Sequence, residues 1–217
     1  MSMAWMRMPG QTWPGVAASF LGMWVVMMVA MMMPSLAPVL WHYREAVRRA
    51  RATSPGWLMT LVGLGYFFVW TVFGVALFPL GVSLTTIEMQ QPPLARAVPI
   101  VAGVVVLMAG AFQFTSWKAR YLACCRDVSG RGDAQGARTR TALLDGVRFG
   151  LQCAPCCANL MVILVVMGVM DLGAMAVVTA AITAERLAPT GARVSRGIGV
   201  IAVGAALLLI ARAAGLA

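Results

Sequence analysis

The sequence predicts an all-α fold, a polytopic transmembrane helical bundle, and two observations carry that prediction. Of the 217 residues, 61% are apolar and only 11% are charged, whereas globular domains have about 45–50% apolar and about 25% charged residues. The apolar residues also gather in long blocks and do not recur at the spacing of an amphipathic helix or strand. A soluble domain is therefore excluded, and residues 1–217 are expected to form one integral membrane domain.

The apolar blocks predict six spans, at residues 16–40, 57–82, 94–115, 149–168, 172–185 and 197–211. The first is long enough, at about 1.5 Å per residue, to cross a hydrocarbon core of about 30 Å, and too long for the core of a signal peptide. The block that begins at residue 149 is too long for one helix, so we expect a turn near Gly168–Gly173. The polar residues 116–148 are expected to form the longest solvent-facing loop, on the cytoplasmic side.

The positions of Lys and Arg predict the orientation, because cytoplasmic loops are enriched in these residues. The first, third and fifth loops hold 14 of the 17 basic residues, and the opposite side holds only Arg7, Arg96 and Arg212. We therefore expect those three loops in the cytoplasm and both termini outside. The net charge of +10 then marks orientation, and no nucleic-acid partner is expected.

Methionines line the first span. Met23, Met27 and Met31 recur every fourth residue, and Met28 and Met32 form a neighbouring stripe. Thioethers bind Cu(I) without losing a proton, so this face suits a series of exchangeable Cu(I) sites. The composition favours the same metal, with 17 Met and 1 His. The alternative is that methionine serves here as a flexible apolar filler.

Two prolines follow the methionines directly. Pro34 and Pro38 each remove an amide donor, so the helix is expected to kink or break there. Irregular backbone at membrane depth is tolerated where it is buried in protein or lines a polar cavity, which favours a functional role for Met31 and Met32. His42 lies one turn beyond Pro38, either as a further ligand or simply solvated.

Five cysteines form two groups near the expected cytoplasmic face. Cys153, Cys156 and Cys157 begin the predicted fourth span, and Cys124 and Cys125 follow the third. The cytosol is reducing, so free thiols are expected. At the start of a helix the amide dipoles stabilise thiolates, which suits Cu(I) binding or a redox dithiol. A Cys₄ zinc site is disfavoured because adjacent cysteines point apart on a helix, and burial as small hydrophobic residues is the remaining alternative.

Glu185 ends the predicted fifth span beside Arg186. A charge at the edge of a span is a functional candidate, and the alternative is an ordinary interfacial ion pair with Arg186 or the loop arginines. The sequence holds no Ser-His-Asp set, P-loop or paired-carboxylate site, so no enzymatic activity is expected.

Three ordered motifs resemble a known family. The segment from Trp24 to Pro34, with Pro38, is similar to the W-x-x-M-x-x-A-M-M-x-P-x-x-x-P signature of the predicted metal-binding integral membrane protein family. This is a bacterial domain family in which some members are described as copper chaperones for a tyrosinase-like polyphenol oxidase. Two further stretches resemble it through Gln113, Lys118, Leu122, Cys125 and Arg126, and through Cys153, Cys156, Cys157, Leu160, Met161, Gly168, Met170 and Met175. Glu185 stands at the position where the family has a Glu that ends a span.

The chain also departs from the family pattern. Tyr121 stands where the family has its first loop Cys, Pro155 replaces a Gly, Ala158 replaces a Trp, and Asp171 replaces an Asn. Ligation through the loop cysteines is therefore less strongly implied than ligation through the group that begins with Cys153.

The residues and the resemblance together give one leading hypothesis. They point to a multi-pass protein of the bacterial inner membrane that binds Cu(I) and passes it to a copper-dependent oxidase. The expected ligands are Met27, Met31, Met32, Cys125, Cys153, Cys156, Cys157 and Glu185. The rival hypothesis is a small-solute or metal transporter, or a structural membrane subunit in which Met and Cys only pack helices.

Overall fold

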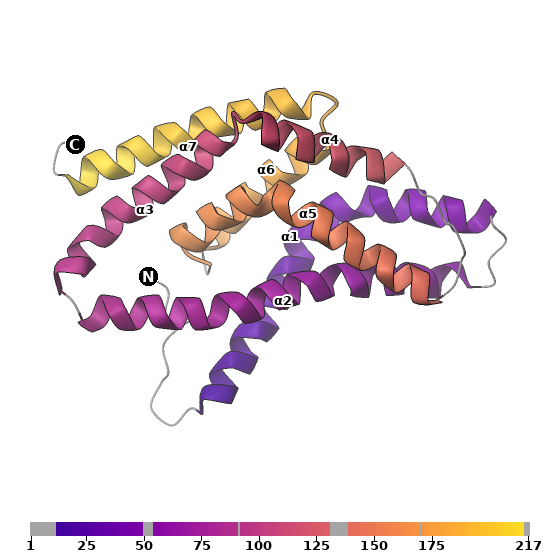
Figure 1. Ribbon diagram of the computed structural model, residues 1–217, viewed down its shortest axis with the longest axis horizontal. Helices are drawn as coiled ribbons and strands as arrows, with labels where there is room; N and C mark the ends of the chain where they lie inside the picture. Colours follow the sequence, from indigo (N-terminus) through magenta and orange to yellow (C-terminus); the bar gives the residue numbers. More distant parts are fainter. Residues whose placement is uncertain (1–11, 50–53, 91, 131–138, 170, 215–217) are drawn as a thin grey trace.

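The computed structural model describes residues 12–49, 54–90, 92–130, 139–169 and 171–214. Within these ranges the fold is all-α, as predicted, with seven helices and no strand (Figure 1). The helices are α1 (Trp13–Arg49), α2 (Pro55–Gln90), α3 (Pro92–Phe112), α4 (Ser116–Gly130), α5 (Thr139–Met167), α6 (Leu172–Leu187) and α7 (Gly191–Ala213).

Four of these helices, α1, α2, α5 and α7, are long and apolar enough to cross a membrane. Helices α3 and α4 together form a bent pair with an angle of 66° between them, which has the character of a broken span or a re-entrant loop. Helix α6 has 16 residues and reaches about 24 Å, short of a bilayer core of about 30 Å. Of the six predicted spans, four thus coincide with helices of spanning length, and the others fall on the bent pair and on α6.

The surface supports a lipid environment. Large apolar side chains are exposed along most helices, among them Leu172 (78% exposed), Ile201 (73%) and Val26 (70%). Soluble monomers rarely expose continuous apolar surface of this extent. The burial pattern therefore agrees with the composition: side chains of the same apolar type face both inward and outward.

The predicted solvent-facing loop at residues 116–148 is wrong as a description of the structure. Helix α4 occupies 116–130 and buries Lys118, Leu122 and Cys125, while α5 already begins at Thr139. These three buried positions recur every three or four residues, so they share one face of α4. The segment is polar on average because the other faces of α4 are polar. The average composition therefore does not reveal the single face that is buried.

The prolines of α1 bend the helix but do not end it. Helix α1 continues from Trp13 to Arg49 with Pro34 and Pro38 inside it, and it changes direction along its length (Figure 1). A proline removes one hydrogen bond and crowds the preceding turn, so a kink is the expected result.

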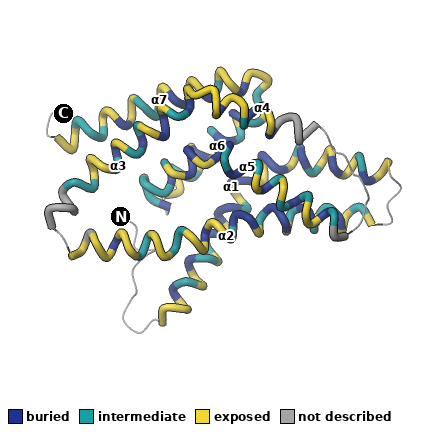
Figure 2. Tube along the Cα trace, in the orientation of Figure 1, coloured by how far each residue is buried: buried dark blue, intermediate teal, exposed yellow. Residues whose placement is uncertain are grey.

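Glycines allow α2 and α5 to pack closely. A Cβ atom at Gly65 would collide with the backbone of α5, and one at Gly146 would collide with the backbone of α2. Small residues at such positions let helices approach to backbone contact. Buried residues concentrate where α1, α2, α5 and α6 cross (Figure 2), and this crossing contains the candidate site.

A candidate sulfur-rich metal site

The predicted sulfur ligands come together at the helix crossing. All seven are buried and belong to one cluster, to which α1 contributes Met27, Met31 and Met32, α4 contributes Cys125, and α5 contributes Cys153, Cys156 and Cys157. Met28 lies in the same cluster. Residues far apart in the sequence thus share one buried cluster, and their sulfur atoms are of the donor type that soft metal ions prefer.

Within the cluster two thiols lie close together. The Sγ atoms of Cys153 and Cys157 are 3.6 Å apart, and the Cys125 thiol donates to the Gln152 carbonyl over 3.1 Å. Metal–thiolate bonds are about 2.3 Å long for zinc, so sulfurs up to about 4.6 Å apart can share one ion. The Cys153–Cys157 pair meets that limit without rearrangement of the helix.

Other predicted candidates lie outside the cluster. Cys124 is exposed, so the Cys₄ zinc site that would need it does not form. His42 is also exposed. Among the described residues, His, Cys, Asp and Glu side chains form no group of three or more that could hold a metal ion. A site at this crossing therefore relies on a thiol pair together with thioethers.

Cys153 accepts two hydrogen bonds from other helices. The Tyr66 hydroxyl of α2 donates to its Sγ over 3.1 Å, and the Arg186 guanidinium of α6 donates to it over 3.2 Å. The same Nη1 atom of Arg186 also donates to the Ser35 hydroxyl of α1 over 3.0 Å. Arg186 thus joins three helices at the edge of the sulfur cluster and brings a positive charge to one of its thiols.

The prediction that these cysteines begin a helix is wrong. Helix α5 starts at Thr139, so Cys153 lies about four turns inside it. The dipole of a helix acts within its first turn and falls off beyond it. The nearest source of positive charge for the Cys153 sulfur is therefore Arg186, which the sequence placed in a loop.

Glu185 lies in a fully buried polar network. Its Oε2 atom accepts from the Lys118 ammonium over 2.8 Å, with the two side chains only 2% and 1% exposed, and its Oε1 atom accepts from the Gln113 amide over 2.8 Å. Lys118 also donates to the Cys156 carbonyl over 2.5 Å and to Asn159 Oδ1 over 3.0 Å. The alternative of an interfacial ion pair with Arg186 or a loop arginine is therefore wrong, because both carboxylate oxygens are engaged by Lys118 and Gln113.

Two cavities border these groups. A small one of about 10 Å³, which is room for about one water molecule, is lined by Leu36, Val39, Tyr66, Cys125, Phe149, Gln152 and Arg186. The Gln152 Oε1 atom is buried and has no hydrogen-bond partner in the structure. The small cavity therefore lies beside the Cys125 thiol, the Arg186 guanidinium and the Gln152 side chain.

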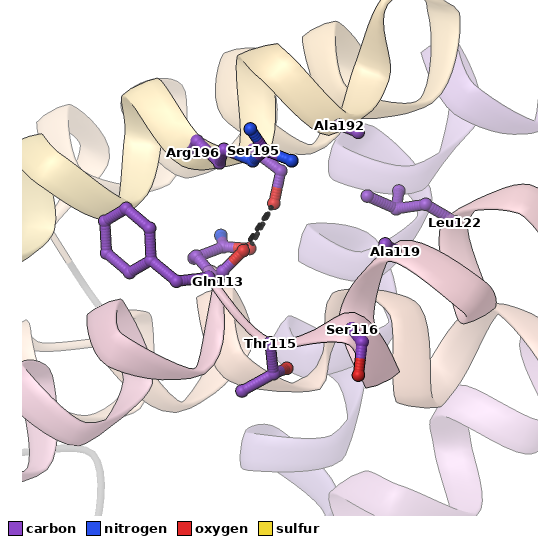
Figure 3. Close-up of a pocket in the computed structure, with 9 residues that line it drawn as sticks. Gln113, Thr115, Ser116, Ala119, Leu122, Ala192, Ser195 and Arg196 are labelled. Atoms are coloured by element: carbon purple, nitrogen blue, oxygen red, sulfur yellow. Dashed lines mark hydrogen bonds between the residues drawn. The ribbon is translucent and has the colours of Figure 1, made fainter.

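The larger cavity, of about 270 Å³, lies at the bend between α3 and α4, against α7 (Figure 3). Arg196, Thr115 and Ser116 line it, and at its wall the Ser195 hydroxyl donates to Gln113 Oε1 over 2.8 Å. Since Gln113 also holds Glu185, this wall is continuous with the buried ion pair.

Sequence reasoning missed several polar groups around the candidate site. Tyr66 donates to Cys153 and Ser195 donates to Gln113, and no local pattern marks either residue because its partner lies far away in the sequence. Arg186 carried a usable signal: it follows the buried Ile182 by four residues, which places both on one face of α6. Lys118 carried a similar one through its spacing from the buried Leu122.

Comparison with known proteins gives one family. The model of the PpoB2 family, described as copper chaperone, matches residues 21–209. This range includes all seven predicted sulfur ligands and the Lys118–Glu185 network. The comparison with curated proteins gives no match, and neither does the comparison with solved structures.

Proposed function

The chain belongs to the PpoB2 family of copper chaperones, and on this premise we propose that it binds Cu(I) within a membrane and delivers it to a copper enzyme. The chemistry would be coordination and transfer, with no bond of an organic substrate made or broken. A copper-dependent oxidase is the kind of client that the sequence resemblance suggests.

The observation that carries the proposal is the sulfur cluster itself. It unites four thioethers of α1, those of Met27, Met28, Met31 and Met32, with four thiols of α4 and α5 in a buried crossing. Soft thiolates and thioethers select Cu(I) over Mg²⁺, Ca²⁺ and Mn²⁺, which prefer oxygen ligands. Thioethers hold the ion loosely and thiolates hold it tightly, so we propose Met27, Met31 and Met32 as exchange sites and the cysteines as the holding site.

We leave Glu185 out of the proposed ligand set. Its two carboxylate oxygens accept hydrogen bonds from Lys118 and Gln113, and Lys118 in turn holds the Cys156 carbonyl. Glu185 therefore serves the site by fixing α4 against α5, because the Lys118 ammonium would otherwise be buried without an anion.

We also propose a multi-pass location in the bacterial inner membrane, with the cysteines toward the cytoplasmic face. The C-terminal end of α1 and the N-terminal ends of α2 and α5 gather at one end of the molecule (Figure 1). Two of the arginines that predict the orientation, Arg48 and Arg49, lie in the last turn of α1. The opposite end holds the α2–α3 junction and the end of α7.

Copper retention tests the proposal directly. Purified protein, reduced and loaded with Cu(I) under anaerobic conditions, should keep copper after gel filtration. A variant with Cys153, Cys156 and Cys157 changed to Ser should lose it. The matched control is Cys124→Ser, which removes an exposed thiol and should keep the wild-type copper content. Equal copper in all three proteins would overturn the proposal.

The methionines need a separate test, because they can also act as packing residues. Replacing Met27, Met31 and Met32 together by Leu keeps their volume and removes the sulfur. Slower copper transfer to an acceptor chelator, with copper still bound, is the expected result. Unchanged transfer would assign these side chains to packing, and altered copper uptake by whole cells without any enzyme defect would favour transport.

A further inference from the structure

Arg186 is a partly buried cation, and among the described residues no carboxylate forms an ion pair with it. In the part of the chain that the structure describes, ion pairs join Lys118 to Glu185 and Arg49 to Glu45. Among the described side chains, no carboxylate oxygen lies within 4.0 Å of the Arg186 guanidinium. Lys118 and Glu185 neutralise each other, so within the described part of the chain the Arg186 charge at the helix crossing has no carboxylate partner.

The Arg186 guanidinium lies beside a cysteine sulfur. The Nη1 atom of Arg186 lies 3.2 Å from the Cys153 Sγ, and that sulfur lies 3.6 Å from the Cys157 Sγ. Arg186 also lines the small cavity beside the cluster. A charge next to a low-dielectric interior is costly unless an opposite charge is close by, so the geometry calls for an anion at the thiol pair.

We propose that this anion is the bound copper complex: Cu(I) held by the thiolates of Cys153 and Cys157, with Arg186 as its counter-ion. Two thiolates and one Cu(I) carry a net charge of minus one, and the guanidinium makes the assembly neutral. On binding, two S–H bonds are replaced by two Cu–S bonds, two protons leave, and copper stays Cu(I). This inference rests on the proposed function and specifies its ligand number and charge.

The arrangement also explains the role of the other donors. Tyr66 donates to the same Cys153 sulfur over 3.1 Å, and hydrogen bonds to a charged acceptor are about twice as strong as neutral ones. Thioethers add no charge, so methionines can exchange with the complex without disturbing its neutrality. Arg186 is thus a positioning and charge-matching residue, and it is not itself a ligand.

Affinity for Cu(I), measured by competition with a chromophoric chelator, tests this inference. The Arg186→Gln variant should bind Cu(I) at least about tenfold more weakly, since a hydrogen bond to a charged group contributes about 1.5–3 kcal/mol. Arg186→Lys keeps the charge and should recover most of the affinity. The matched control is Arg193→Gln, an exposed arginine of α7, which should bind as the wild type does.

A double-mutant cycle separates charge matching from a merely structural role. In the Cys157→Ser background the complex loses one thiolate and becomes neutral, so Arg186→Gln should then weaken binding by less than about threefold. X-ray absorption of the wild-type protein should show copper bound by two sulfurs. Circular dichroism in detergent confirms that each variant is folded.

The outcomes distinguish the two proposals. If wild-type protein retains no Cu(I), the proposed function fails. If it retains Cu(I) while Arg186→Gln binds equally tightly, or loses the same factor with and without Cys157, the charge-matched complex is refuted and copper binding stands.

Discussion

Changing Glu185 to Gln tests whether the buried ion pair holds α4 in place. The Lys118 ammonium uses its three hydrogens on Glu185, the Cys156 carbonyl and Asn159, and both charged side chains are almost fully buried. The substitution keeps the shape of the side chain and removes its charge. Lys118 then becomes a buried cation with no anion beside it.

The expected cost follows from that loss. Removing one partner of a buried ion pair destabilises a protein by about 3–5 kcal/mol. The amide oxygen of Gln still accepts from Lys118, so we expect a value near about 3 kcal/mol. The double variant Lys118→Met with Glu185→Gln removes both charges and should recover at least about half of this loss. Its remaining deficit reflects the Cys156 carbonyl and Asn159, which lose their donor.

Unfolding in mixed micelles with increasing SDS, followed by circular dichroism, measures these free energies. A cost below about 1 kcal/mol for Glu185→Gln would refute the reasoning. So would a double variant whose loss equals the sum of the two single losses, because coupled charges are not additive. Asp171→Asn is the matched carboxylate control: Asp171 caps α6 by accepting from the Ala174 amide, and Asn caps helices equally well.

The same variants decide whether Glu185 binds copper. Both of its oxygens are engaged by protein donors, so the folded double variant should retain as much Cu(I) as the wild type. Loss of copper from that variant, with helicity intact, would instead make Glu185 the ligand that the sequence predicted.

Three further predictions concern packing and access. Gly146→Ala places a Cβ against the α2 backbone and should cost about 1–3 kcal/mol in the same unfolding assay, whereas Gly197→Ala, with nothing within 4 Å, should cost nothing. Trp24→Phe removes an indole hydrogen bond to α2, so we expect a loss of about 1–3 kcal/mol; an unchanged midpoint would contradict this. In the folded protein, a maleimide should label Cys124 quickly and Cys153 only after unfolding, as mass spectrometry can show.

Local patterns in the sequence predicted much of the fold. Long apolar blocks predicted helices, and helices fill the described ranges. The turn expected near residue 168 is confirmed: Gly168 has a φ of +125°, a conformation that favours glycine, and Asp171 then caps the next helix. Met27 and Met31 of the methionine stripe lie in the core, and their role as copper ligands stays a prediction. Each of these signals lies within a few residues of the structure that it specifies.

The polar part of the site could not be predicted in this way. Gln113 and Glu185 are hydrogen-bonded although 72 positions separate them, and no local pattern relates them. The distribution of basic residues among the loops also predicted that Lys118 and Arg186 lie in cytoplasmic loops, as surface charges. In the structure Lys118 is buried in an ion pair and Arg186 donates to a thiol. The positions of basic residues in a single sequence predict a side of the membrane for each charge, and they carry no information on the residue with which that charge pairs.

The placement of Cys153 shows how one local misreading changes the chemistry. The predicted span began at residue 149 because charged residues precede it, yet Ala142, Gly146 and Gly150 are buried at intervals of four. This stripe of small residues packs on α2 and extends α5 back to Thr139. The thiols consequently lie deep in the helix, where the dipole of its first turn does not reach. A positive charge beside these thiols must then come from another element, and α6 brings the Arg186 guanidinium to the Cys153 sulfur.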